Sequence, residues 1–219
     1  MAFQLAYLWS VLPKLVAASL INLQLALLIA LIALVAATLL TIVRVMKIRA
    51  INMSINLVIS LVRGTPLLIQ IFICYYVLPS IGLDLSPIQA GVLAISINST
   101  IFIAETMRGS LQTIDPGQIE AATALGLARG PIWHRVILPQ LFRQILPMLV
   151  NEMTVIVKGT ALLSVITVID VLRTAQQIAS ASFRPFETLI GAAIVFLFIN
   201  TVFIVLGSAL EHRLAGRGA

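Results

Sequence analysis

Charged and amide side chains interrupt several apolar stretches of this chain, and these residues are the ones that could bind a small polar molecule. Glu152 lies in the apolar stretch that runs from about residue 138 to residue 157, with Arg143 and Lys158 in or beside it. An unpaired carboxylate in lipid costs about 3 kcal/mol or more, so Glu152 should face the protein interior or water. Two interpretations stay open: contact with a cationic or amino group of a substrate, or an internal ion pair with Arg143 or Lys158.

Three further polar residues are candidates for the same chemistry. Asn98 offers hydrogen-bond donors and acceptors, and it either binds a polar substrate or holds two helices together. Thr65 and Thr160 are weaker substrate-binding candidates, because threonine at such positions more often packs or caps a helix. Arg63 lies near the middle of an apolar stretch, and we favour a structural or snorkelling role for it over substrate contact.

The common catalytic and metal-binding patterns do not occur in the sequence. The two histidines, His134 and His212, are far apart, and Cys74 has no second cysteine to pair with. We find no Gly-x-Ser-x-Gly, no His-Glu-x-x-His and no Walker motif. We therefore expect no metal or cofactor, disfavour an intramembrane enzyme, and expect no ATP hydrolysis by this chain alone.

Composition places the chain in a membrane. Of its 219 residues 60% are hydrophobic and only 10% are charged, whereas soluble domains carry about 25% charged residues. Most of its outer surface must therefore face lipid. The net charge of +6 is explained by basic residues on cytoplasmic loops rather than by nucleic-acid binding. Trp9 and Trp133 fit anchoring at the membrane interface.

The apolar segments predict an all-α membrane protein with one transmembrane domain over residues 1–219. Each helical crossing needs about 20 apolar residues. Pro66 lacks a backbone N–H and should kink the second span. Val168 to Ser182 has apolar residues at helical spacing on one face, which favours a helix along the membrane surface. The five expected spans run over residues 15–43, 53–77, 87–107, 138–157 and 188–210.

The basic residues predict the orientation. With the N-terminus outside, eight of them fall on the cytoplasmic side and three on the outer side. The positive-inside rule then puts the C-terminus and the polar loop of residues 108–135 in the cytoplasm. The inner residues are Arg44, Lys47, Arg49, Arg108, Arg129, Arg135, Arg213 and Arg217, and the outer ones are Lys14, Arg173 and Arg184.

The cytoplasmic loop contains a short capped helix. Asp115 can cap it, Pro116 suits its first turn, and Gln118 can reach back to the cap backbone. Gly126 suits a left-handed position at its end. The alanines between them would let another surface approach closely. From physical reasoning alone, a docking helix and a plain connector remain equally open.

The loop sequence resembles the EAA loop of ABC importer permeases. The family pattern is Glu-Ala-Ala, three residues, Gly, nine residues, Ile, one residue, Leu-Pro. Here Glu120, Ala121, Ala122, Gly126, Leu138 and Pro139 match it, with Val136 at the isoleucine position. Other segments resemble the permeases for polar amino acids: residues 63–68, Asn98-Ser99, Ala104-Glu105, Arg108-Gly109, Asn151-Glu152 and residues 158–162.

The resemblance implies a five-span type I importer subunit with a cytoplasmic coupling helix. In that family a second permease subunit, identical or homologous, completes the pathway through the membrane lipid. Two cytoplasmic ATPase subunits receive the EAA helix, an external binding protein delivers an amino acid, and alternating access moves it inward. The family uses the position of Glu152 in its substrate site.

One position departs from the family pattern. Gly159 replaces an aspartate that many relatives carry, which puts in doubt whether this subunit alone builds a complete site. The alternatives are a permease for another small polar solute and a secondary transporter, although the latter usually has internal repeats, which this sequence lacks.

Overall fold

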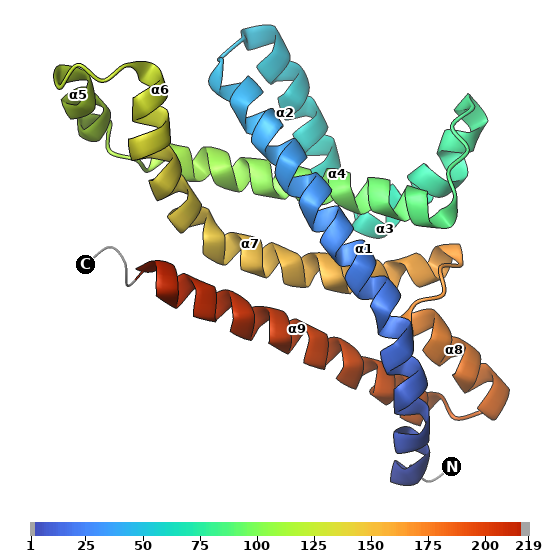
Figure 1. The fold of residues 1–219 in the computed structure, drawn as a ribbon. Coiled ribbons are helices and arrows are strands. Elements are labelled where there is room, and N and C mark those ends of the chain that lie inside the picture. The colour runs from blue at the N-terminus through green and yellow to red at the C-terminus, as the bar shows by residue number, and fades with distance from the viewer. Residues whose placement is uncertain (1–2, 216–219) are drawn as a thin grey trace.

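The computed structural model describes residues 3–215, and helices dominate this part of the chain. The sequence-predicted tail residue Arg217 lies outside the described residues. Four long helices form the framework, and shorter ones connect them (Figure 1). The elements are α1 (Leu5–Val45), α2 (Arg49–Gly64), α3 (Leu67–Phe72), η1 (Ile73–Val77), η2 (Leu78–Ile81), α4 (Pro87–Gln112), α5 (Pro116–Ala124), α6 (Arg129–Ile132), η3 (Trp133–Ile137), α7 (Leu138–Thr160), η4 (Ala161–Ile166), α8 (Val171–Ser182) and α9 (Pro185–Ala215).

Four helical segments are long and apolar enough to cross a membrane: Leu5–Val45, Pro87–Gln112, Arg129–Ile166 and Pro185–Arg213. The first begins at Leu5 rather than at Leu15, so Pro13 and Lys14 lie within α1. The fourth expected span is also longer than predicted, because α6, η3, α7 and η4 follow one another without a break between residues 129 and 166.

The second expected span is broken rather than kinked. The segments Arg49–Gly64 and Leu67–Ile81 meet at 109°. Thr65 and Pro66 between them are extended, with ψ of 140° at both residues. Proline disfavours helical geometry in the residue before it, so Thr65 leaves the helix and the chain turns. The position of the expected kink was right, and its size was underestimated.

Helix ends follow the local sequence signals at two positions. Ser86 and Gln89 form a reciprocal capping box at the start of α4, with Pro87 as its first residue. Asp170 caps α8 by accepting a hydrogen bond from the backbone N–H of Arg173 at 2.8 Å. Val171 and Ala175 on the apolar side of α8 are buried, so that side faces the protein.

Small residues let the long helices pack closely around α1, which contacts α4, α7 and α9. Ala26, Ala33 and Ala37 on α1 are fully buried, as small residues at helix interfaces in membranes often are. Gly207 on α9 lies so close to Val150 on α7 that an added Cβ would come within 2.3 Å of a valine methyl group. Two ends result: α5 and α6 project from one, and α8 lies at the other (Figure 1).

Candidate functional site

Glu152 lines a cleft between α4 and α7 with a volume of about 310 Å³. One of its carboxylate oxygens is buried and has no hydrogen-bond partner among residues 3–215. The hydroxyl of Ser99 on α4, itself buried, is the neighbouring polar group. No ion pair joins Glu152 to Arg143 or Lys158 in the described chain, so the internal pairing considered from the sequence is not found.

The remaining walls of the cleft are mostly apolar, and one carries an aromatic ring. Phe102, Ile145 and Met148 lie beside Glu152. The guanidinium carbon of Arg63, on α2, lies 5.9 Å from the centre of the Phe102 ring, within the range of a cation–π contact. The expected structural role of Arg63 agrees with this contact. A polar molecule in the cleft would meet one carboxylate, the Asn151 amide, the Thr106 hydroxyl and the face of a ring.

Asn98 lies one residue before Ser99 on α4 but takes part in another contact. Its amide nitrogen donates to the side-chain oxygen of Gln70 on α3 at 3.1 Å. Gln70 in turn donates to the backbone carbonyls of Val62 at 2.8 Å and Thr65 at 3.1 Å. Asn98 therefore helps to hold the broken second span, as the helix-linking interpretation expects. Its carbonyl oxygen has no partner among the described residues and stays open to a ligand.

The two threonine candidates satisfy their hydroxyls within the chain. Thr65 donates to the carbonyl of Leu61 at 2.9 Å and so caps the end of α2. Thr160 is fully buried; it donates to the carbonyl of Val157 at 2.7 Å and accepts from the amide of Asn22 on α1 at 2.8 Å. These contacts fit the packing and capping roles rather than substrate contact. Neither threonine lies in the Glu152 cleft.

Gly159, where many relatives carry aspartate, is buried between α7, α3 and α4. An added Cβ there would lie 3.4 Å from a methyl group of Leu67 and 3.9 Å from one of Ile95. This position is thus surrounded by apolar side chains, which leave room for little more than a Cβ atom. An aspartate at this position would place its carboxylate against these side chains, so glycine suits the packing of this subunit.

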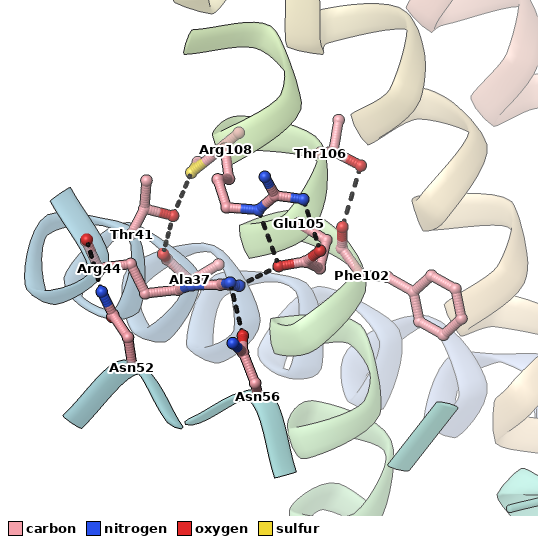
Figure 2. Close-up of polar contacts among 10 residues, drawn as sticks. Ala37, Thr41, Arg44, Asn52, Asn56, Phe102, Glu105, Thr106 and Arg108 are labelled. Atoms are coloured by element: carbon pink, nitrogen blue, oxygen red, sulfur yellow. Dashed lines mark hydrogen bonds and ion pairs between the residues drawn. The ribbon is translucent and has the colours of Figure 1, made fainter. Parts of the chain in front are cut away.

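An ion cluster that the sequence reading did not single out joins three helices (Figure 2). Glu105 on α4 pairs with Arg44 on α1 and, through two hydrogen bonds of 3.2 and 3.0 Å, with Arg108 one turn along α4. Arg44 also donates to the side chain of Asn56 on α2 at 2.8 Å. The sequence does contain a signal for this cluster. Glu105 is an acidic residue in an apolar span, and such a residue needs a partner. Arg44 at the end of the first span and Arg108 at the end of the span that contains Glu105 are basic.

The cytoplasmic loop helix α5 has the ends that its sequence predicts. Asp115 accepts a hydrogen bond from the N–H of Gly117 at 2.8 Å and caps the helix. Gly126 has a φ of 77°, with its N–H on the carbonyl of Thr123 and the N–H of Leu127 on that of Ala122. This pair of bonds is a Schellman motif, which closes the helix after one left-handed residue.

The Gln118 part of the capping prediction is wrong. Its side-chain oxygen accepts from the amide of Gln140 on α7 at 2.6 Å instead of reaching the cap backbone. This bond ties α5 to the start of α7, where Leu138 and Pro139 form the first turn. The bond therefore fixes α5 beside the helical turn that contains the Leu-Pro end of the motif.

Ala122 is buried, whereas the sequence led us to expect that the alanines of this helix let another surface approach closely. It packs with Ile114, Ile132 and Ile137 in a small apolar cluster beneath the loop. Glu120 and Ala121 are exposed. Leu125, which sequence reasoning passed over, is 82% exposed at the tip of the loop. The outward surface of α5 and of the turn after it thus carries the Glu120 carboxylate, small side chains, Ile119 and the protruding Leu125.

With the bundle, its loop and its cleft described, the chain can be compared with known proteins. The family model of the binding-protein-dependent transport system inner membrane component matches residues 29–216. The chain belongs to this family. It is a multi-pass inner-membrane permease subunit of an ABC importer, a transport component whose ATPase is a separate subunit in this family, and not an enzyme.

Individual relatives agree with the family. The arginine transport system permease protein ArtQ of Bacillus subtilis is 37% identical over 156 residues, 71% of each chain. The octopine transport system permease protein OccM of Rhizobium radiobacter is 33% identical over 98% of this chain and 91% of its own. The crystal structure of an amino acid ABC transporter with histidines matches with a TM-score of 0.90 at 33% identity, covering 97% of this permease and 100% of that chain.

A more distant structure shows the same fold. The inward-facing MetNI methionine ABC transporter matches with a TM-score of 0.71 at 15% identity over 97% of this chain and 99% of its own. The type I importer permease fold expected from the resemblance is thereby confirmed.

Proposed function

We propose that this permease carries a polar amino acid with a cationic or amino group into the cytoplasm, and that Glu152 binds that group. The unpartnered oxygen of Glu152 in the cleft between α4 and α7 is the observation that supports this most strongly. A buried carboxylate oxygen without a hydrogen-bond donor is costly, and a substrate ammonium or guanidinium would supply the missing donor. Relatives named for arginine, nopaline and octopine transport support the same chemistry.

The proposal includes five crossings, with the N-terminus outside and the C-terminus in the cytoplasm. Support comes from helix direction. The backbone N–H of Gln4 before α1 donates to Glu187 near the start of α9 at 3.1 Å, so the two helices begin at the same end. The pair of Arg44 and Glu105 puts the ends of α1 and α4 together. The chain must then return between α1 and α4, which makes the broken α2–α3 segment one crossing.

The coupling proposal assigns the outward surface of α5 to a cytoplasmic ATPase dimer. Glu120, Ala121, Leu125 and the turn at Gly126 would make this contact, with Ala122, Leu138 and Pro139 supporting them from within. The cap at Asp115 and the bond to Gln140 make the loop rigid enough to transmit movement to α7. A second permease, identical or homologous, and an external binding protein complete the proposed importer.

Uptake by the reconstituted complex tests the substrate site. Glu152→Gln keeps the size of the side chain and removes the charge, so uptake of a cationic amino acid should fall about tenfold or more, the value of a hydrogen bond to a charged group. Glu211→Gln, at the far end of α9, is the matched control and should transport normally. If Glu152→Gln transports every polar amino acid tested as well as the parent, Glu152 has only a structural role.

A further inference from the structure

A second hollow in the bundle is too apolar for an amino acid. It has a volume of about 580 Å³ and lies between the C-terminal ends of α1 and α4 and the start of α7. Ile42, Leu138 and Phe142 are among its lining residues. Its two threonines turn their hydroxyls to their own helix, Thr38 to the carbonyl of Leu34 at 2.8 Å and Thr41 to that of Ala37 at 2.7 Å. The groove therefore offers carbon surface and almost no free hydrogen-bonding group.

A basic hollow of about 280 Å³ adjoins this groove, and the two share Val45 and Leu111 as wall residues. Arg44, Lys47 and Arg108 line the basic hollow, and no acidic residue is among its described lining. Glu105 pairs with both arginines, so the cluster carries a net positive charge. An apolar groove thus continues into a cationic hollow at one end of the bundle.

Lys47 is the cation that this cluster leaves unpaired. It is exposed and forms no ion pair with any residue that the structure describes. Its backbone φ is +55°, a left-handed conformation that residues with a side chain rarely adopt. The tight turn between α1 and α2 holds it at the edge of the basic hollow, where an anion would meet it.

We propose that the joined hollows bind an anionic phospholipid, with an acyl chain in the apolar groove and the phosphate at Lys47. Each half of such a lipid matches the surface that it would contact. The acyl chain meets the apolar groove, and the negatively charged phosphate meets the basic hollow. A lysine or arginine near the surface of an anionic leaflet contributes about 1 kcal/mol to lipid binding. Trp133 in the groove wall fits the aromatic side chains found at headgroup level. An apolar helix of a second permease would fill the groove but leave the cationic hollow unmatched.

Native mass spectrometry of the purified permease–ATPase complex tests the lipid site, with phosphatidylglycerol and phosphatidylcholine titrated separately. The parent should retain phosphatidylglycerol in preference to phosphatidylcholine. Lys47→Gln should lower phosphatidylglycerol occupancy about fivefold, the effect of one surface cation. Thr38→Trp, which fills the groove from an exposed position, should lower the binding of both lipids.

Arg213→Gln is the matched control, because Arg213 is an exposed cation on α9 that lines neither hollow. Equal losses in Lys47→Gln and Arg213→Gln would mean general surface attraction and would overturn the site. Unchanged binding of phosphatidylglycerol in Lys47→Gln would also overturn the proposed lipid site. A cysteine placed at Thr38 in a Cys74→Ser background must also fail to cross-link two permease copies, since a cross-link would show that the second subunit occupies the groove.

Discussion

The amide nitrogen of Asn22 on α1 donates a hydrogen bond to the carboxylate of Asp170 at 3.2 Å, although 148 positions separate the two residues. Both side chains are almost completely buried. The carbonyl oxygen of Asn22 accepts from the N–H of Val171 at 3.1 Å, and Thr160 accepts from the same amide group. This single asparagine therefore fixes the start of α8 against α1 and α7.

Asp170 should give the importer a pH-dependent stability. Burial raises the pKa of its carboxyl above the ordinary value of about 3.9, and hydrogen bonds from Arg173 and Asn22 offset part of the effect. The folded state then binds the proton more tightly than the unfolded state, so this contribution is present at low pH and is lost as the pH rises through the raised pKa. Relative to Asp170→Asn, the parent should lose thermal stability as the pH rises above about 4.

Thermal unfolding of the parent and of Asp170→Asn, measured at several pH values from about 4 upward, gives the difference in stability between them. The Asp170→Asn variant also loses one acceptor, which shifts its stability by a constant amount and leaves the slope as the diagnostic quantity. Asp84→Asn, in the exposed turn before α4, is the control and should follow the parent. Parallel curves for the parent and Asp170→Asn would contradict the raised pKa.

The sequence indicated the local ends of helices well and their tertiary partners poorly. Asp115, Ser86 and Gly126 act within a few residues of themselves, so their roles follow from local chemistry. Asn22 lies in a stretch that contains no charge and was read simply as apolar, yet an amide within a span also needs partners. Which partners it has depends on α7 and α8, and no local pattern contains that information.

The candidate site shows the same limit. Glu152 was identified because a carboxylate in an apolar stretch requires an explanation. That reasoning does not depend on the tertiary structure. Neither threonine candidate lies in the Glu152 cleft, because Thr65 closes the end of α2 and Thr160 is bonded to Asn22 on α1. The 109° break after Gly64 likewise exceeds what Pro66 alone predicts, because Gln70 and Asn98 hold the two segments in that geometry.

Removal of the Glu105 charge should loosen the end of the bundle where α1, α2 and α4 meet. Glu105→Gln leaves Arg44 and Arg108 with only neutral partners, and a hydrogen bond to a charged group contributes about 1.5–3 kcal/mol. The thermal midpoint of the purified permease should fall, while Glu120→Gln on the exposed side of α5 should not change it. Equal midpoints for Glu105→Gln and the parent would show that the cluster contributes nothing to stability.

Two glycines of the cytoplasmic loop allow the effect of backbone strain to be measured without any steric clash. Gly126 has a φ of 77° and Gly130 lies in α6 with ordinary helical geometry, and an added Cβ would meet no atom within 4 Å at either position. Gly126→Ala should therefore destabilise the Schellman turn by about 1 kcal/mol. Gly130→Ala should be neutral or slightly stabilising. Protease cleavage of the loop in the purified permease should accelerate only in Gly126→Ala; the same cleavage rate in both variants would contradict the strain at Gly126.

A pair of adjacent alanines tests whether α5 is a docking helix or a connector. Ala121 is exposed, whereas Ala122 packs on Ile114, Ile132 and Ile137. A large side chain at Ala121 blocks an approaching surface and leaves the loop folded. The same side chain at Ala122 overfills the small cluster, and overpacking costs about 1–3 kcal/mol.

We therefore expect Ala121→Trp to keep the thermal stability of the isolated permease but to release the ATPase or uncouple its hydrolysis from uptake. Ala122→Trp should lower stability and coupling together. The measurements are the thermal midpoint of the permease, the ATPase retained on the purified complex, and hydrolysis stimulated by substrate. Normal retention, stimulation and uptake in Ala121→Trp would show that the exposed side of α5 touches no ATPase and that the loop only connects α4 to α7.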